Sequence, residues 1–502
     1  MFPTSSRQTD PAGSLIDGDA ADRRWSGAAL DAELDRLAAL LKDPAGRDLV
    51  MLFCGSSADD ALLLLGALRA GHAAAPFDHD LPAGRRRDLV AAYRPLWLFQ
   101  RTRDGEGEED APPGYAAHPV PISTSVGGLC CWRRLGDAEP AIHPDLAVLL
   151  GTSGTLGSPR TARLSRSGLA ANARAAAAAL RIAPGDVAVG HLRLSYAFGL
   201  SMLLSHLAAG AAVAMTEQGM MGRGLWEMMR RKGCTTLPCV PAQAAMLCRL
   251  DPGRLTLPAL RRIVQAGGRA APDHLARLHG FCAGQGGGRN DGLFVMYGQT
   301  EAGPRIAVLP PEEFPQRPGS AGRAIDGCRL AIAGPDGAPL PPGIAGQVVV
   351  HGPGVMMGYA AGRGDLADGD RLGGRLETGD RGHLDADGFL HLAGREGRIA
   401  KPCGHRIDLD ELEGLALAGR PAGAGLVAAV DGGDRVVLFL EAAAMEADME
   451  DSALRSWPAR LAAEYGHPAS AFTVRPVAAL PLTGRGKIDY ARLHAWSQEE
   501  TP

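Results

Sequence analysis

One short segment of this sequence combines the residue types that suit the binding of a phosphate group. Residues 152–160 read Thr-Ser-Gly-Thr-Leu-Gly-Ser-Pro-Arg and follow the strand-like run 145–150. Glycines let backbone N–H groups approach anionic oxygens closely, hydroxyl side chains add donors, and a cation at the end balances phosphate charge. No Gly-Lys-Ser/Thr follows, so this is not a Walker A sequence. The residues expected to contact phosphate are Thr152, Ser153, Gly154, Thr155, Gly157 and Arg160.

Alternating strands and helices are expected to position this loop. The expected strands lie at 49–54, 73–77, 145–150 and 187–194, and the expected helices lie at 28–42, 61–70, 167–180 and 200–208. Such alternation is typical of βαβ units around mostly parallel sheets. We therefore predict an α/β fold with a large N-terminal domain of mixed and parallel sheets and packed helices.

The C-terminal residues have a different organisation. A hairpin is expected over 382–392, turned at Asp387-Gly388, and the charged stretch 394–401 follows it. Beyond that stretch we expect one strand-like run, 436–440, and one short helix, 457–464. The change predicts a boundary near 395–398, with an N-terminal domain over 1–394 and a small, mobile α+β domain over 395–502.

The composition is that of an ordinary globular protein. Of 502 residues, 46% are hydrophobic and 22% are charged, and 52 Lys+Arg against 56 Asp+Glu give a formal net charge of -4. This balance leaves no broad basic surface, so nucleic-acid binding is not expected. The nine cysteines form no Cys-x-x-Cys pair, which predicts reduced thiols. Because residues 1–25 lack a signal-peptide pattern and polar residues interrupt the apolar stretch 197–215, we expect a cytoplasmic protein without a membrane span.

Four further segments follow the glycine-rich loop in order along the chain. They are Tyr297-Gly298-Gln299-Thr300-Glu301, then Glu377-Thr378-Gly379-Asp380, then Gly394-Arg395 with Lys401-Pro402-Cys403-Gly404-His405-Arg406-Ile407, and finally Pro481-Leu482-Thr483-Gly484-Arg485-Gly486-Lys487-Ile488-Asp489. Together with the loop, they resemble the motifs of the acyl-adenylate-forming superfamily, which contains acyl-CoA synthetases, adenylation domains of peptide synthetases and luciferases. The typical loop of that superfamily reads Thr-Ser-Gly-Thr-Thr-Gly-x-Pro-Lys-Gly. The resemblance runs from about residue 56 to residue 493.

The resemblance implies a role for each segment. Tyr297 would pack against adenine, with Gly298 and Gln299 beside the nucleotide, and Thr300 would approach the α-phosphate. Glu301 would bind Mg²⁺, which suits a hard cation that prefers carboxylate oxygen. Asp380 would accept hydrogen bonds from the ribose hydroxyls.

The C-terminal segments imply the remaining roles. Arg395 would contact ribose or phosphate, and Gly397 stands at the hinge, where glycine absorbs large backbone rotations. Lys487 would reach the carboxylate and the α-phosphate during adenylation. The residues that would face coenzyme A are Lys401, Gly404, His405 and Arg406.

A run of aromatic and small residues, 194–200, resembles the acyl-pocket motif of the same superfamily. It implies that Tyr196, Phe198 and Gly199 line the pocket. The far wall, which also lies near adenine, would be formed by Gln265, Ala266, Gly267 and Gly268, with Gly298 nearby. Relatives that activate amino acids carry an Asp here, and none stands between residues 192 and 206. We therefore expect a carboxylic acid that lacks an α-amino group.

These roles together imply an AMP-forming acid–thiol ligase. The expected substrates are a small-molecule carboxylic acid, ATP with Mg²⁺, and coenzyme A. No carrier-domain serine motif follows Lys487 in this sequence, which favours coenzyme A over a carrier-protein pantetheine as the acceptor. Whether the chain forms a homodimer is left open.

Three departures from the typical loop leave alternatives open. Leu156 replaces a threonine, Arg160 replaces a lysine that it does not match in shape, and Thr161 replaces a glycine whose φ we expect to be positive. They suggest a ligase that only converts a supplied acyl-adenylate to a thioester. A non-catalytic acyl-adenylate sensor and a luciferase-like oxidation are further alternatives, although the retained Lys487 and Glu301 argue against a sensor.

Overall fold

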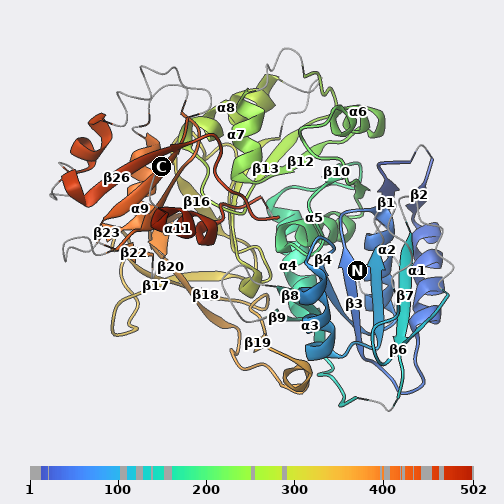
Figure 1. Ribbon diagram of the computed structural model, residues 1–502. Helices are drawn as coiled ribbons and strands as arrows, with labels where there is room; N and C mark the ends of the chain where they lie inside the picture. The colour runs from blue at the N-terminus through green and yellow to red at the C-terminus, as the bar shows by residue number, and fades with distance from the viewer. Residues whose placement is uncertain are drawn as a thin grey trace.

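The structure is a computed structural model of the whole chain. It describes residues 13–499 except 21, 102–109, 120–127, 137–138, 152–160, 250–254, 285–290, 396–397, 401–406, 419, 421–423, 434, 443–454, 463–468 and 485. Two large sheets with helices on both faces form most of it, and a small three-stranded sheet lies near the C-terminus (Figure 1). The predicted α/β class is therefore confirmed.

One large sheet joins thirteen of the described strands. In order across the sheet these are β17 (Arg329–Ala333), β18 (Gly346–His351), β20 (Arg375–Leu384), β21 (Leu390–Arg395), β16 (Ser320–Ala324), β15 (Ala307–Leu309), β14 (Gly292–Tyr297), β13 (Arg262–Gln265), β12 (Thr236–Cys239), β10 (Val187–Gly190), β11 (Ala212–Met215), β1 (Ser14–Asp17) and β2 (Arg24–Ser26). From β14 to β1 neighbouring strands are parallel, whereas the strands from β14 to β17 pair antiparallel. The parallel part is the one that matters for the site, because its strand ends meet at one edge.

The other sheets are smaller. An eight-stranded sheet runs β19 (Tyr359–Ala360), β9 (Thr161–Ser165), β8 (Leu146–Gly151), β4 (Ala73–Asp78), β3 (Leu49–Cys54), β5 (Trp97–Arg101), β7 (Leu129–Arg134) and β6 (Tyr115–Ala117). A two-stranded ribbon joins β22 (Ile399–Ala400) to β23 (Ile407–Asp408), and a three-stranded sheet joins β24 (Val427–Asp431), β25 (Val436–Glu441) and β26 (Phe472–Val477).

Helices connect and cover these sheets. They are α1 (Ala28–Leu41), α2 (Ala58–Arg69), α3 (Ala83–Tyr93), α4 (Arg166–Ala179), α5 (Ala197–Ala208), α6 (Arg223–Lys232), α7 (Pro241–Arg249), α8 (Pro272–Gly284), α9 (Leu409–Ala418) and α11 (Tyr490–Gln498). Short 3-10 turns span η2 (Thr300–Ala302), η3 (Arg363–Ala367) and η5 (Ala469–Ala471), and residues 455–462 are also helical. None of the described helices combines the length and apolar character needed to cross a lipid bilayer.

The largest apolar cluster lies between the two large sheets. It contains side chains from β3, β8 and β9 of one sheet, from β11, β13 and β14 of the other, and from α2, α4 and α5. Helices α6, α7 and α8 cover the opposite face of the thirteen-stranded sheet, and α3 covers that of the eight-stranded sheet. Helices α2 and α5 are therefore almost wholly buried between the sheets, which explains their apolar composition, and α4 buries one side there.

The C-terminal sheet has helices on both faces. Helix α9 packs on one face, while α11 and apolar residues of α7 pack on the other. Figure 1 shows these elements in orange and red beside α7 and α8. The sequence prediction here was incomplete, because α9, β24, β26 and α11 were not expected. Strand β26 carries Pro476 and lies at a sheet edge, where proline is tolerated.

Two predicted boundaries near the site were also wrong. Strand β10 ends at Gly190, although the apolar pattern continues to Leu194. Leu192 and Leu194 are buried in the connection that follows, where the N–H of Leu194 donates to the carbonyl of Gly55 at 3.0 Å. The pattern therefore combined a short strand with a buried loop, and α5 begins at Ala197 rather than at residue 200.

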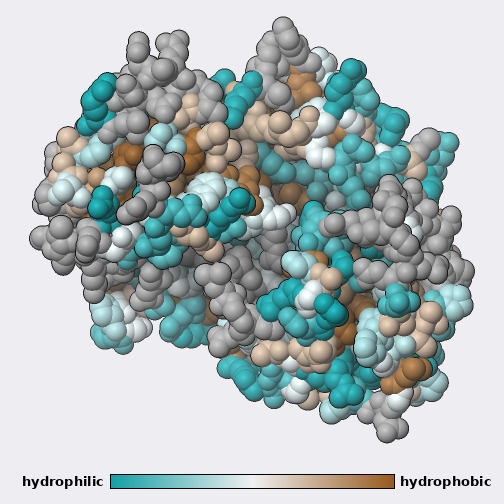
Figure 2. Space-filling view, in the orientation of Figure 1, coloured by the Kyte–Doolittle hydropathy of each residue, from teal (hydrophilic) through white to brown (hydrophobic). Residues whose placement is uncertain are grey.

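The surface is ordinary for a globular protein. In the coloured parts of Figure 2, hydrophilic and hydrophobic residues are interspersed. Large exposed apolar side chains such as Met221 and Leu135 come from separate parts of the chain. Scattered apolar residues of this kind do not indicate a binding surface.

Candidate active site

Adjacent parallel strands deliver the predicted acyl-pocket and nucleotide residues to one edge of the large sheet. Gln265 ends β13, Tyr297 ends β14, and the connection 191–196 follows β10. In an open α/β sheet, ligands bind outside the carboxyl ends of such strands. Segments that are far apart in the sequence are therefore brought together by the register of the sheet.

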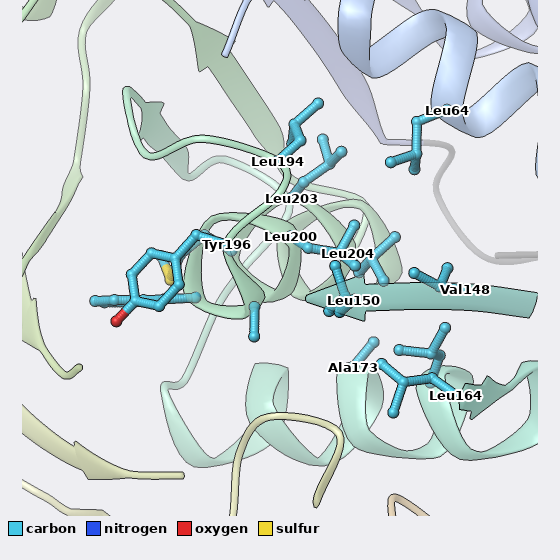
Figure 3. Close-up of a cluster of buried hydrophobic side chains, with 14 of the residues drawn as sticks. Leu64, Val148, Leu150, Leu164, Ala173, Leu194, Tyr196, Leu200, Leu203 and Leu204 are labelled. Carbon is cyan, nitrogen blue, oxygen red and sulfur yellow. The ribbon is translucent and has the colours of Figure 1, made fainter. Parts of the chain in front are cut away.

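Tyr196 occupies the N-cap position of α5 at this edge. Gly199, in the first turn, is held close to the preceding loop, because a Cβ atom there would lie 2.3 Å from the carbonyl oxygen of Arg193. Figure 3 shows Tyr196 at the end of the buried leucine cluster, with its hydroxyl pointing away from those leucines. Its ring packs edge-to-face against that of Phe198, with 6.2 Å between the centroids.

The far wall predicted for the acyl pocket contacts Tyr196 directly. A Cβ atom added at Gly267 would lie 2.2 Å from the Tyr196 hydroxyl oxygen, and Gly267 has a φ of +89°. Gln265 donates a hydrogen bond from Nε2 to the carbonyl of Gly268 at 3.1 Å, and Ala266 is buried beside them. Both walls of the predicted pocket therefore meet in the structure, and only glycine fits at position 267.

The second and third motifs are joined by a hydrogen bond. The hydroxyl of Tyr297 donates to Oδ2 of Asp380 at 2.5 Å, and both side chains are buried. Gln299 approaches the carbonyl of Thr378 from Nε2 at 3.5 Å. Asp380 also lies opposite Arg395 in the antiparallel pair of β20 and β21. The predicted nucleotide residues on β14, β20 and β21 are therefore neighbours.

Glu301 lies in the short turn η2, together with Thr300, directly after this motif. Its carboxylate Oε1 accepts a hydrogen bond from the hydroxyl of Tyr359 at 2.9 Å. Its carbonyl accepts from the N–H of Met356 at 2.9 Å. Gly298, just before the turn, passes so close to Pro304 that a Cβ atom would lie 1.7 Å from the carbonyl oxygen of Pro304.

Strand β9, which follows the glycine-rich loop in the sequence, lies close to Glu301. Tyr359 and Ala360 of β19 pair with Ala162 and Thr161 of β9, and the N–H of Met357 donates to the carbonyl of Arg163 at 2.8 Å. Because residues 356–360 contact both β9 and Glu301, the start of β9 and the second motif lie together. The loop residues Thr152, Ser153, Gly154, Thr155, Leu156, Gly157 and Arg160 themselves lie outside the described residues.

The expectation for Thr161 was wrong. Thr161 is a regular residue of β9, paired with Gly151 and Ala360, and among the described residues only Arg94 and Arg181 are non-glycine residues with positive φ. Its hydroxyl lies 2.9 Å from that of Tyr93 inside the protein. A β-branched residue suits a strand, so Thr161 introduces no backbone strain.

Lys487 reaches the acyl-pocket motif from the C-terminal segment. A tight turn holds it, in which the N–H of Thr483 donates to the carbonyl of Lys487 at 2.7 Å and Gly486 has a φ of +71°. Its Nζ lies 5.5 Å from the ring centroid of Tyr196, within the range of a cation–π interaction. Val240 lies between the two segments, because Cβ atoms at Gly267 and Gly486 would come within 3.2 and 3.1 Å of its two methyl carbons.

The structure does not describe the residues predicted to face coenzyme A. Gly397, Lys401, Gly404, His405 and Arg406 lie outside the described residues, as does the side chain of Arg395. Contacts between the C-terminal elements and α7 and α8 include the ion pairs Arg420–Asp273 at 2.6 Å and Arg249–Glu441 at 3.5 Å.

One residue at the pocket was not expected. The guanidinium carbon of Arg305 lies 4.4 Å from the ring centroid of Phe198, and Arg305 is only 2% exposed. Burial lowers the pKa of Arg305 to about 9. The signal in the sequence was a single arginine at the head of the apolar run 306–309, four residues after Glu301.

Comparison with known proteins shows the family to which the chain belongs. Residues 4–360 match the AMP-binding enzyme family. The chain is 29% identical to the indoleacetate–CoA ligase of Aromatoleum aromaticum, over 78% of each chain, and 28% identical to the oxalate–CoA ligase of Arabidopsis thaliana, over 76% of each. The crystal structure of ATP-bound MatB from Rhodopseudomonas palustris is 21% identical and superposes with a TM-score of 0.74 over 98% of this chain and 97% of MatB. The chain belongs to the AMP-binding enzyme family, as the motifs predicted.

Proposed function

We propose that this chain is an acyl-CoA ligase, which activates a carboxylic acid with ATP and Mg²⁺ as an acyl-adenylate and then transfers the acyl group to coenzyme A. The observation that carries the proposal is the position of Lys487 over the ring of Tyr196. A flexible cation from the C-terminal segment thereby reaches the edge where the predicted acyl and nucleotide residues meet. The membership of the AMP-binding enzyme family and the CoA ligases among its relatives support it.

The first half-reaction brings two anions together. A carboxylate oxygen attacks the α-phosphorus of ATP, the bond from that phosphorus to the bridging oxygen breaks, and pyrophosphate leaves. Lys487 would reduce the repulsion between the carboxylate and the phosphate, and Thr300 would donate to the α-phosphate. Asp380 and Tyr297 would hold the ribose and adenine. Positioning and charge stabilisation of this kind are the main contributions that a protein makes to phosphoryl-centre displacement.

Glu301 is the residue that would hold the metal ion. Within the described residues no group of three or more His, Cys, Asp and Glu side chains could bind a metal by itself. That fits Mg²⁺, which is commonly bound by one or two carboxylates together with substrate phosphates. When bound, the ion neutralises phosphate charge. The hydrogen bond from Tyr359 holds the Glu301 carboxylate beside the start of β9.

The second half-reaction requires a different face. The sulfur of coenzyme A attacks the acyl carbonyl carbon, the bond to AMP breaks, and the thiol proton passes to solvent. We place this step at Gly404, with residues 395–502 turning about Gly397 between the steps. The ion pairs Arg420–Asp273 and Arg249–Glu441 each include a well-exposed partner, so breaking them costs little. Domain rotations of this kind gate many enzymes.

The acid lacks an α-amino group in this proposal, because no acidic residue stands between 192 and 206 to pair with an ammonium. The thioester-only alternative has lost one of its three supports, since Thr161 is an ordinary strand residue. Leu156 and Arg160 are the departures that still favour it.

The test is to incubate the full chain with ATP, Mg²⁺, coenzyme A and a panel of acids, and to detect acyl-CoA and AMP by mass spectrometry. Pyrophosphate exchange with each free acid is measured in parallel, and synthetic acyl-AMP is supplied separately with coenzyme A. Exchange together with acyl-CoA is the expected result. Thioester formation from acyl-AMP without any exchange would support the thioester-only alternative, and the absence of both would refute the ligase.

A further inference from the structure

Arg305 is a buried cation that lies against the predicted acyl-pocket residue Phe198. In the described part of the chain no carboxylate lies within ion-pair distance of it. Its one hydrogen bond runs from Nη2 to the carbonyl of Phe198 at 3.5 Å, the long limit for such a bond, and its Nε has no acceptor. The guanidinium therefore has N–H donors that the described residues leave unused.

The other buried arginines of the described residues have partners for their charge or for their N–H groups. Arg262 is paired with Asp186 and Asp291, both at 2.7 Å. Arg134 and Arg363 are both paired with Asp48. Arg163 donates to backbone carbonyls, including that of Met357 at 2.9 Å. Three of these four arginines also have an unpaired Nε, but each has a short contact from its Nη atoms to a carboxylate or a carbonyl, which Arg305 lacks among the described residues. A buried charge without such a partner is strongly unfavourable. Such a residue is expected where a ligand supplies the missing charge.

The position of Arg305 indicates whether the acyl group or the nucleotide supplies that charge. Its guanidinium lies over Phe198, while Lys487 lies over Tyr196, so each ring of the edge-to-face pair carries one cation. Phe198 and Tyr196 are the predicted acyl-pocket residues. The predicted nucleotide residues Tyr297 and Asp380 are hydrogen-bonded to each other, and neither is a partner of Arg305.

A second feature of the pocket favours negative charge. Helix α5 begins at Ala197 without a side-chain cap, and its first turn contains Phe198. The first N–H groups of a helix have no partner within the helix, and the positive end of the helix dipole attracts anions. Because no acidic residue lies between 192 and 206, nothing in this segment neutralises that end.

We propose that Arg305 binds a second anionic group of the acyl substrate, so that the preferred acid carries a carboxylate or a sulfonate at its far end. This inference rests on the proposed ligase function. The carboxylate that reacts lies at the Lys487 side, and the far anionic group lies at Arg305, where the planar guanidinium can make two parallel hydrogen bonds to it.

The experiment compares matched acids with the wild type, Arg305→Met and Arg305→Lys. The acids are succinate and glutarate, their half-amides, and 3-sulfopropionate, and kcat/KM for acyl-CoA formation is measured for each. We expect the wild type to favour a dianion over its half-amide by roughly 10–100-fold, because hydrogen bonds to charged groups are strong. Arg305→Met should abolish that preference, and Arg305→Lys should keep part of it. The sulfonate arm shows whether the site takes either anion or only carboxylate.

Thermal unfolding distinguishes a role of Arg305 in binding the substrate from a role in stabilising the fold. Removing an unpaired buried charge should leave the midpoint of Arg305→Met at or above that of the wild type. A lower midpoint with an unchanged preference among the acids would overturn the inference. So would an equal loss of pyrophosphate exchange with every acid, which would place Arg305 on the phosphates.

The two proposals fail in different ways. Conversion of half-amides in preference to dianions would overturn the role of Arg305 while leaving the ligase intact. The absence of acyl-AMP and acyl-CoA with every acid would overturn both.

Discussion

The hydroxyl of Tyr196 lies against Gly267, at a point where a methyl group would come within 2.2 Å of the phenol oxygen. This contact joins the two predicted walls of the acyl pocket, the start of α5 and the segment after β13. It also makes the pocket sensitive to the smallest possible change of side chain.

Gly267→Ala should therefore damage the site through Tyr196. The new methyl group displaces the hydroxyl, and alanine at a φ of +89° adds roughly 1–3 kcal/mol of strain. Because misplacement by about 1 Å can reduce a rate by roughly 10²-fold, we expect a loss of at least tenfold in kcat/KM. The loss should be smaller in a Tyr196→Phe background. Gly280→Ala, which has open space around it, is the control. Equal losses in both backgrounds would contradict the contact.

Asp380→Asn should weaken the use of ATP selectively. The carboxylate accepts the Tyr297 hydroxyl at 2.5 Å, and in our proposal it also accepts from ribose. Loss of hydrogen bonds to a charged group should raise KM for ATP by roughly 10–100-fold, with little change in KM for the acid. Asp336→Asn, in an exposed turn, is the matched control. An unchanged KM for ATP would rule out the ribose role.

Tyr359→Phe should alter the dependence on magnesium. It removes the hydrogen bond to Glu301 Oε1 but leaves the carboxylate in place. We expect the Mg²⁺ concentration for half-maximal pyrophosphate exchange to rise by roughly 3–10-fold. This change corresponds to the upper part of the range of free energies that a single hydrogen bond contributes. Tyr115→Phe, whose hydroxyl bonds to Pro95, tests for a general effect of losing a phenol. A shift in the control as large as that in Tyr359→Phe would contradict this positioning role.

His206 should make the protein sensitive to acid. Burial lowers the pKa of His206 to about 4, whereas an unfolded histidine titrates near 6.5. Between these values the unfolded chain binds a proton that the folded chain does not. The free energy of unfolding should then fall as the pH drops from 6.5 to 4, by up to about 1.4 kcal/mol per pH unit for this group. Urea unfolding at pH 7, 6 and 5 should show a shallower decline in His206→Leu. Identical slopes would show that His206 does not contribute.

The candidate site residues were proposed from the resemblance of the motifs, and the sheet explains why several of them lie together. Gln265 and Tyr297 end buried strands, and a parallel sheet necessarily brings such ends to one edge. The hairpin turned at Asp387-Gly388 was also correct, because Gly388 adopts the positive φ that such a turn needs.

The remainder depended on tertiary contacts that a local pattern does not contain. Arg305 has no distinguishing signal in the sequence beyond its place before an apolar run, and its burial against Phe198, with no carboxylate in ion-pair distance among the described residues, became apparent only in the structure. Thr161 was judged from a loop pattern, whereas its conformation is set by pairing with Gly151 and Ala360. Short strands such as β24 and β26 gave too little periodicity to be recognised.

The most direct test of the account is pyrophosphate exchange by the wild type and by Lys487→Ala, with the acid that gives the highest rate. If Lys487 acts where the acyl and nucleotide residues meet, the exchange rate should fall by roughly 10²–10³-fold. Thioester formation from synthetic acyl-AMP should fall far less, because that step does not need the repulsion between carboxylate and ATP to be overcome. Equal rates of exchange in the two proteins would contradict the proposal that these segments form one adenylation site.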